Sequence, residues 1–119
     1  MGHVTVNIRL ANPQFGLRDK LTDKALVDTG ATFTTIPEAV ARKLRLKSIG
    51  KRKVSTAARS QVLDQSYAYI EIDGRNTVTP LLISKTLDKI LLGVITLEAL
   101  GLSVDPTKGE LKEAETLLL

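Results

Sequence analysis

A carboxylate that directly follows a short apolar stretch is the feature that most constrains this chain. Residues 25–27 are apolar and indicate a short buried strand, which leads into Asp28 and is then broken by Thr29 and Gly30. A buried carboxylate without partners shifts its pKa or destabilises the fold. Gly30 permits a tight turn that brings backbone N–H groups to the carboxylate, and the Thr29 hydroxyl can donate and accept. The alternative is a surface turn in which Asp28 caps a helix, but such a cap needs no apolar triplet before it.

A similar pattern occurs again near the end of the chain. Residues 90–92 are apolar and lead into Gly93, a predicted helix over residues 95–100, and Gly101 in a helix-ending position. The first copy leads through its glycine turn to a helix that Pro37 and Glu38 are suited to begin. The second copy carries no acid at its turn, and alone it would fit a core strand followed by a packed helix.

Most of the remaining chain predicts strands. Residues 4–10 alternate between apolar and polar, which is typical of a half-buried strand, and Asp73-Gly74 is a strong two-residue hairpin turn. Further strands are expected over residues 54–57, 61–63, 67–72, 77–83 and 102–104, with Ala58, Arg59 and Ser60 at the tip of the first hairpin and a basic connection over residues 47–53.

The composition excludes several classes of enzyme. The 119 residues suffice for one domain, and they include no Cys and a single His, His3, which we expect to be exposed. Disulfides, thiol nucleophiles, Ser-His-Asp catalysis and zinc sites with several His are therefore excluded. The first residues lack the pattern of a signal peptide, and the longest uncharged apolar run, residues 90–97, is too short to span a bilayer. We expect a soluble, cytoplasmic protein with no membrane partner.

The net charge of +4 is unevenly distributed. No acid occurs between Glu38 and Asp64, whereas eight Lys and Arg residues do. Such a block can bind phosphates or an acidic partner, and it can equally be a solvated helix face and loop. No aromatic residue interleaves with the block, so stacking on nucleic-acid bases is poorly supported and a nucleic-acid partner is unlikely.

The segment Leu-Val-Asp-Thr-Gly-Ala-Thr, with Ile36-Pro37 after it, resembles the signature of retropepsin-like aspartic proteases. The resemblance extends from the Asp28 turn to Leu111. It implies one domain over residues 1–119 with an all-β, closed-barrel-like retropepsin fold and one or two short helices. The implied site residues are Asp28 as catalytic acid and base, Thr29, Gly30 and Ala31 in the active-site turn, and Leu92 and Gly93 in the second motif.

The resemblance also implies hydrolysis of a peptide or protein substrate by a homodimer, without a metal or cofactor. The reaction needs two carboxylates that share a proton, and the chain offers one Asp-Thr-Gly, so a second copy must supply the other. A hairpin over residues 54–62 would be the flap that covers the substrate. Its tip is expected among Thr56, Ala57, Ala58, Arg59 and Ser60, and the apolar tail Leu117-Leu118-Leu119 is expected at the dimer contact.

The chain differs from this family at three places. Thr32 and Val94 stand where retroviral members often carry charged residues, and the flap lacks glycine between Gly50 and Gly74. The salt bridges that those charges make near the subunit contact must therefore be absent or replaced. Two other functions stay open: a non-catalytic module of the same fold that binds extended peptides, and a basic nucleic-acid-binding domain.

Overall fold

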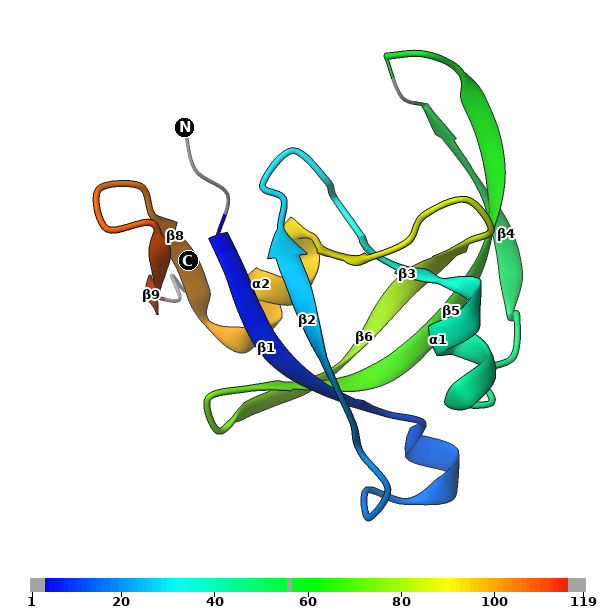
Figure 1. Ribbon diagram of the computed structural model, residues 1–119, viewed down its shortest axis with the longest axis horizontal. Helices are drawn as coiled ribbons and strands as arrows, with labels where there is room; N and C mark the ends of the chain where they lie inside the picture. The colour runs from blue at the N-terminus through cyan, green and yellow to red at the C-terminus, as the bar shows by residue number, and fades with distance from the viewer. Residues whose placement is uncertain (1–3, 56, 116–119) are drawn as a thin grey trace.

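Six strands curl into a closed barrel in the computed structural model, which describes residues 4–55 and 57–115 (Figure 1). Antiparallel pairing of β1 with β5 closes the barrel, and β4 pairs with the outer edge of β5. The order of the strands in the sheet is β1 (Val4–Ala11), β2 (Leu21–Val27), β7 (Ile90–Leu92), β3 (Thr34–Pro37), β6 (Arg75–Ser84), β5 (Ser60–Ile72) and β4 (Gly50–Ser55).

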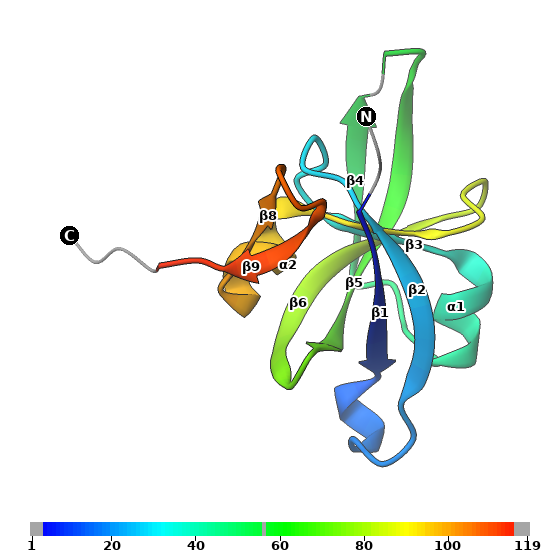
Figure 2. The same cartoon turned by 60° about the vertical axis from the view of Figure 1, so that its left-hand side comes forward.

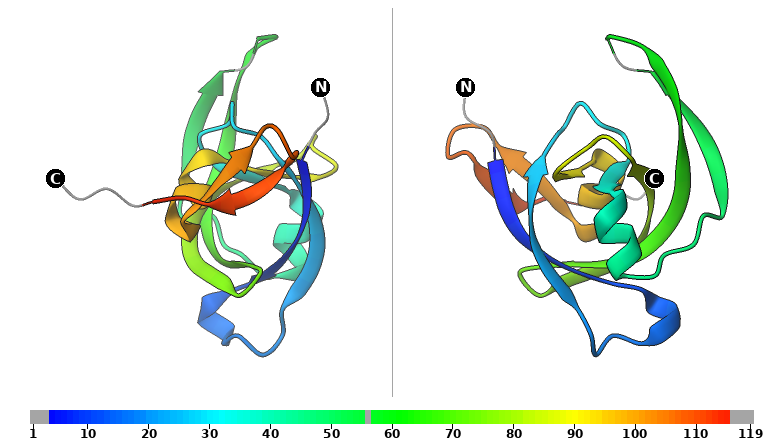
Figure 3. Two further views of the ribbon diagram at one scale, coloured as in Figure 1. Left: turned by 90° about the vertical axis from the view of Figure 1, so that its left-hand side faces the viewer. Right: turned by 45° about the vertical axis from the view of Figure 1, so that its right-hand side comes forward.

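The other elements lie around this barrel. They are the 3₁₀ turn η1 (Pro13–Phe15), the helices α1 (Glu38–Lys43) and α2 (Val94–Leu100), and a two-stranded sheet of β8 (Leu102–Asp105) and β9 (Glu110–Glu113). Figures 2 and 3 show β8 and β9 beside α2, away from the long β4–β5 hairpin. Within the described residues, no helix is long and apolar enough to cross a membrane.

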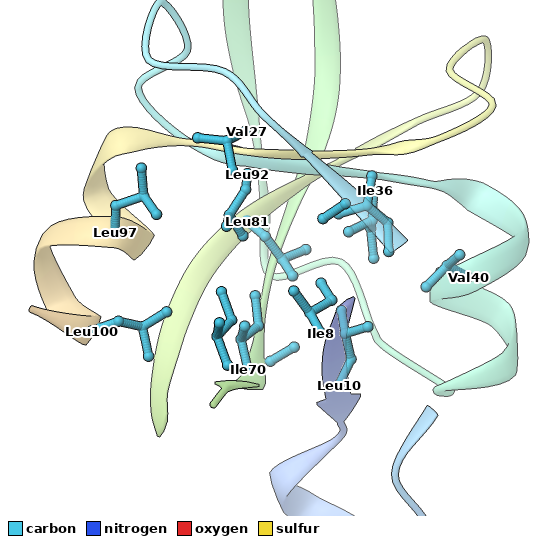
Figure 4. Packing of buried hydrophobic residues seen from close by; sticks show 14 of the residues in the cluster. Ile8, Leu10, Val27, Ile36, Val40, Ile70, Leu81, Leu92, Leu97 and Leu100 are labelled. Carbon is cyan, nitrogen blue, oxygen red and sulfur yellow. The ribbon is translucent and has the colours of Figure 1, made fainter. Parts of the chain in front are cut away.

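The core fills the barrel and continues to both helices. The alternation predicted for residues 4–10 is confirmed: Ile8 and Leu10 are buried, whereas Arg9 is exposed. Figure 4 shows the barrel side chains between Leu97 and Leu100 of α2 and Val40 of α1. Burial of these apolar groups stabilises the short helices, which would not be stable alone.

The two copies of the repeated pattern, in which an apolar strand leads into a glycine turn, lie side by side. Strands β2 and β7 pair in parallel, with Ala25 opposite Ile90 and Val27 opposite Leu92. Because both strands point the same way, Asp28 and Gly93 emerge at the same edge of the sheet. The predicted ends are confirmed too: Asp73 and Gly74 form the β5–β6 turn, and Gly101 ends α2 with a φ of 71°.

The strand boundaries around the basic block were predicted incorrectly. Residues 50–53 belong to β4 instead of a connection, and the two strands predicted at 61–63 and 67–72 are one continuous β5. The short β3 was not predicted at all. The polar residues Asp64 and Ser66 do not break β5 because both have partners. Lys51 Nζ lies 2.9 Å from Asp64 Oδ1, and Ser66 Oγ donates to the Lys47 carbonyl at 2.7 Å.

Charged groups also connect the strands where the barrel closes. Glu71 of β5 lies opposite Arg9 of β1, accepts a hydrogen bond from the Tyr69 hydroxyl at 2.7 Å, and binds Lys20 Nζ at 3.0 Å. The Tyr69 hydrogen bond, followed by that of Lys20, holds the pKa of the Glu71 carboxyl below its usual value. Glu71 therefore stays ionised where β1 and β5 pair to close the barrel.

Candidate active site

Asp28 begins a tight turn at the end of β2, and backbone hydrogen bonds hold both its side chain and its main chain. The Gly30 N–H donates to Asp28 Oδ1 at 2.9 Å, the contact expected from the Asp-Thr-Gly sequence. The Ala31 N–H donates to the Asp28 carbonyl at 3.1 Å, and the Asp28 N–H donates to the Leu92 carbonyl at 3.0 Å. A Cβ at Gly30 would lie 3.2 Å from Asp28 Oδ1, which explains why glycine suits this position. The turn thus fixes the orientation of the carboxylate.

The start of α2, directly after the second motif, binds the Asp28 turn (residues 28–32) through two backbone hydrogen bonds. The Val94 N–H donates to the Ala31 carbonyl at 2.9 Å, and the Ile95 N–H donates to the Thr32 carbonyl at 3.0 Å. Both donors lie in the first turn of α2, where backbone N–H groups have no partner within the helix. At the positions where retroviral members of the family that the sequence resembles often carry charges, this chain joins its two turns through the backbone.

Three buried threonines support both turns, and none of them was predicted from the sequence. Thr34, Thr79 and Thr96 come from β3, β6 and α2, and each is at most 1% exposed. Thr96 Oγ1 lies 2.6 Å from Thr34 Oγ1 and 3.2 Å from Thr79 Oγ1, and the Gly93 N–H donates to Thr34 Oγ1 at 3.0 Å. One signal existed: Thr96 is polar on the same helix face as Leu100.

Replacing Thr96 by Val is expected to lower the free energy of unfolding by about 1–3 kcal/mol, because the buried hydroxyls of Thr34 and Thr79 lose their shared partner while the side-chain volume is kept. Urea unfolding followed by circular dichroism measures this change. The control is Thr5→Val on the exposed face of β1, which should change stability by less than about 0.5 kcal/mol. Equal stabilities of the two variants would show that the threonine cluster contributes nothing.

A cleft of about 740 Å³ lies between the Asp28 turn and the β4–β5 hairpin. The register places Arg52 opposite Leu63 and Val54 opposite Gln61, so these four side chains share the face that lines the cleft. A further part is lined by Ser84 at the end of β6 and by Thr86 and Leu87 after it. In Figure 1, the hairpin rises beyond the barrel at the end where the Asp28 turn lies. The predicted flap, residues 54–62, falls within this hairpin.

The structure brings some of the predicted site residues together. Asp28, Gly30 and Ala31 line the cleft, whereas Thr29 is exposed and Leu92 and Gly93 are buried beneath the turn. Of the predicted flap tip, Ser60 is the first residue of β5, and the predicted strand 54–57 ends at Ser55. Ala57, Ala58 and Arg59 are exposed in the bend between the strands. Thr56, His3 and the tail Leu117-Leu118-Leu119 lie outside the described residues.

Most of the walls of the cleft were not predicted from the sequence. Arg52, Phe33 and Leu87 line it, although nothing in their local sequence marks them. Asp28 is the sole acid among the described residues that line the cleft. Nowhere in residues 4–55 and 57–115 do three or more His, Asp or Glu side chains gather as a metal ion would require.

Comparisons with known structures match this architecture. EIAV protease in complex with the inhibitor HBY-793 is similar with a TM-score of 0.66 and 18% identity, over 98% of this chain and 94% of that one. The solution structure of simian foamy virus (mac) protease is similar with a TM-score of 0.56 and 26% identity, over 79% of this chain and 91% of that one. The foamy viral protease-reverse transcriptase in complex with an RNA/DNA hybrid is similar with a TM-score of 0.59 and 19% identity, over 81% of this chain and 12% of that one. These neighbours confirm the predicted barrel with two short helices.

A search of curated protein sequences finds no match. The model of a protein family described as "gag-polyprotein putative aspartyl protease" matches residues 18–99, which is more than half of the chain and includes the Asp28 turn, the β4–β5 hairpin and the second motif. The chain therefore belongs to this family of retropepsin-like aspartic proteases.

Proposed function

We propose that this protein is an aspartic endopeptidase in which two copies of the chain form one active site. The observation that carries the proposal is the Asp28 carboxylate, held by the Gly30 N–H at 2.9 Å and open to a cleft large enough for a peptide. Membership of an aspartic protease family supports the same function. Residues 1–119 would act as one domain.

The chemistry would need only carboxylates and water. One Asp28 carboxylate takes a proton from the attacking water, while its protonated copy from the second subunit donates a proton to the carbonyl oxygen of the peptide. Two carboxylates in close contact resist double ionisation, which keeps one proton on the pair. The Gly30 hydrogen bond would keep each carboxylate aimed at the water, and Ala31 would line the wall beside it.

The substrate would lie extended between the Asp28 turn and the flap. The cleft-facing side of the β4–β5 hairpin presents backbone and side chains along which a peptide can align as an added strand. Val54 and Leu63 from the hairpin and Leu87 from the opposite wall offer apolar contacts to its side chains. We therefore infer a preference for extended, unfolded segments of peptide or protein.

A homodimer would complete the site for two reasons. The described cleft contains one acid where the mechanism needs two, and the exposed Thr29 side chain makes no hydrogen bond within the described residues. In our proposal Thr29 bonds to the partner subunit across the two-fold axis, and the tail 117–119 adds apolar contact there.

Dilution and subunit mixing test the shared site. Activity per chain should fall when the protein is diluted below the dissociation constant of its dimer, as sedimentation measures it. When Asp28→Asn chains replace wild-type chains at constant total protein concentration, activity should fall as the square of the wild-type fraction, because mixed dimers carry one carboxylate. An activity per chain that stays constant on dilution, and that falls only in proportion to the wild-type fraction, would contradict the dimer.

A non-catalytic peptide-binding module is the second candidate. The observation in its favour is the flap sequence, which has no glycine between Gly50 and Gly74, whereas flaps of this family usually carry glycine near the tip. Digestion of an unbiased peptide library separates the two candidates. Binding of peptides without any cleavage, over a range of pH, would favour the module.

A further inference from the structure

We propose that the cleft selects substrates that carry an acidic side chain, Asp or Glu, and that Arg52 is the residue that recognises it. This inference rests on the proposed function, since it names the substrate class of the same cleft. It starts from the position of a single guanidinium group on the cleft-facing side of β4.

Arg52 is held in place from two directions. Its guanidinium lies 4.6 Å from the centre of the Phe33 ring, and its Nε donates to Gln65 Oε1 at 3.3 Å. Phe33 follows the Asp28 turn by one residue, and both Arg52 and Phe33 line the cleft. An arginine that stacks on an aromatic ring keeps the N–H groups at its edge available for other partners. These two contacts therefore orient the Arg52 guanidinium and leave some of its N–H groups free to bind a ligand.

The Arg52 guanidinium forms no ion pair with an acidic side chain among the described residues. Its neighbour Lys51, in contrast, pairs with Asp64 on the outer face of the hairpin. Asp28 is the one acid among the described residues that line the cleft. A substrate carboxylate can supply the missing partner through paired, charge-assisted hydrogen bonds to the guanidinium.

The flap position of Arg52 implies where the acidic residue sits. Arg52 is three residues before the end of β4, so a peptide aligned along the hairpin would place the recognised side chain away from the scissile bond. In a two-fold dimer, one Arg52 stands on each side of the paired Asp28 residues. We therefore expect preferences on both sides of the cleaved bond, expressed in binding more than in the chemical step.

The test uses peptide substrates that differ at one position, which carries Glu, Gln or Lys. At the best position the wild-type protein should show a kcat/KM about tenfold higher for Glu than for Gln, mainly through a lower KM. The difference should shrink at high salt, because the carboxylate contact is partly exposed. Arg52→Gln should remove the preference, Arg52→Lys should retain part of it, and Arg52→Glu should favour Lys.

The matched control is Lys43→Gln, which removes the same charge from the exposed side of α1 and should leave the Glu preference intact. A second measurement separates this inference from the proposed function: fluorescence anisotropy of labelled Glu and Gln peptides with the Asp28→Asn protein. If the Glu peptide binds more tightly but the wild-type protein cleaves neither peptide, only the proposed protease activity would be overturned. Equal binding of both peptides, no binding, or a Glu preference that survives Arg52→Gln would overturn the acidic subsite.

Discussion

Replacement of Asp28 by Asn is expected to lower kcat/KM for a cleavable peptide by about 10³–10⁴-fold or more, because general acid–base catalysis of this kind contributes up to about 10⁴ and both copies are lost in the dimer. The amide of Asn neither takes a proton from water nor donates an acidic one. Its oxygen can still accept the Gly30 N–H bond that the carboxylate accepts, so the turn should persist. A fluorogenic peptide assay measures the loss, and urea unfolding checks the fold.

Asp73→Asn is the matched control for this prediction. Asp73 is exposed in the β5–β6 hairpin turn with a φ of 48°, a conformation that Asn also adopts readily. This variant makes the same chemical change outside the cleft and should keep full activity. Undiminished cleavage by Asp28→Asn, with the control also active, would remove Asp28 from the mechanism.

Gly93→Ala is expected to cost about 3 kcal/mol or more of stability, because the new methyl group meets backbone instead of a side chain that can move. A Cβ at Gly93 would lie 2.4 Å from the Phe33 carbonyl carbon and 2.8 Å from the Thr34 nitrogen. Either α2 or the segment after the Asp28 turn must shift. Since Val94 and Ile95 bind that turn through their N–H groups, activity should fall together with stability.

Urea unfolding with a parallel peptide assay measures both effects. Gly50→Ala is the control, because a Cβ at Gly50 would meet nothing within 4 Å and the φ of this residue is not positive, so its effect should stay within about 1 kcal/mol. Wild-type stability of Gly93→Ala would show that the two turns can separate without cost. The close approach of Gly93 to Phe33 would then have no structural role.

Features that depend on a few consecutive residues were predictable. The Asp28 turn, the Asp73-Gly74 hairpin and the end of α2 at Gly101 each follow from what one glycine or one short motif allows the backbone to do. The family resemblance added the barrel, which the structural neighbours confirm. The repeated pattern of an apolar strand followed by a glycine turn was also visible in the sequence, but that the two strands, β2 and β7, pair in parallel was not predicted.

Features that depend on distant partners were not predictable. Asp64 and Ser66 looked like a break in β5, and only their contacts with Lys51 and the Lys47 carbonyl show why the strand continues. The hydrogen bond between Thr34 and Thr96 joins residues 62 positions apart, which no local pattern reveals.

The sequence by itself determined the candidate catalytic group of this protein, because a carboxylate, its glycine turn and the strand before it are contiguous in the chain. Only the tertiary structure decided what surrounds that group. Arg52 contacts Phe33 because the register of β4 with β5 places Arg52 on the cleft side, and because the chain after the Asp28 turn passes beside it. Such contacts depend on the closed barrel as a whole. Burial and charge pairing act between residues that are near in space, so the walls of the cleft become known only once the chain is folded.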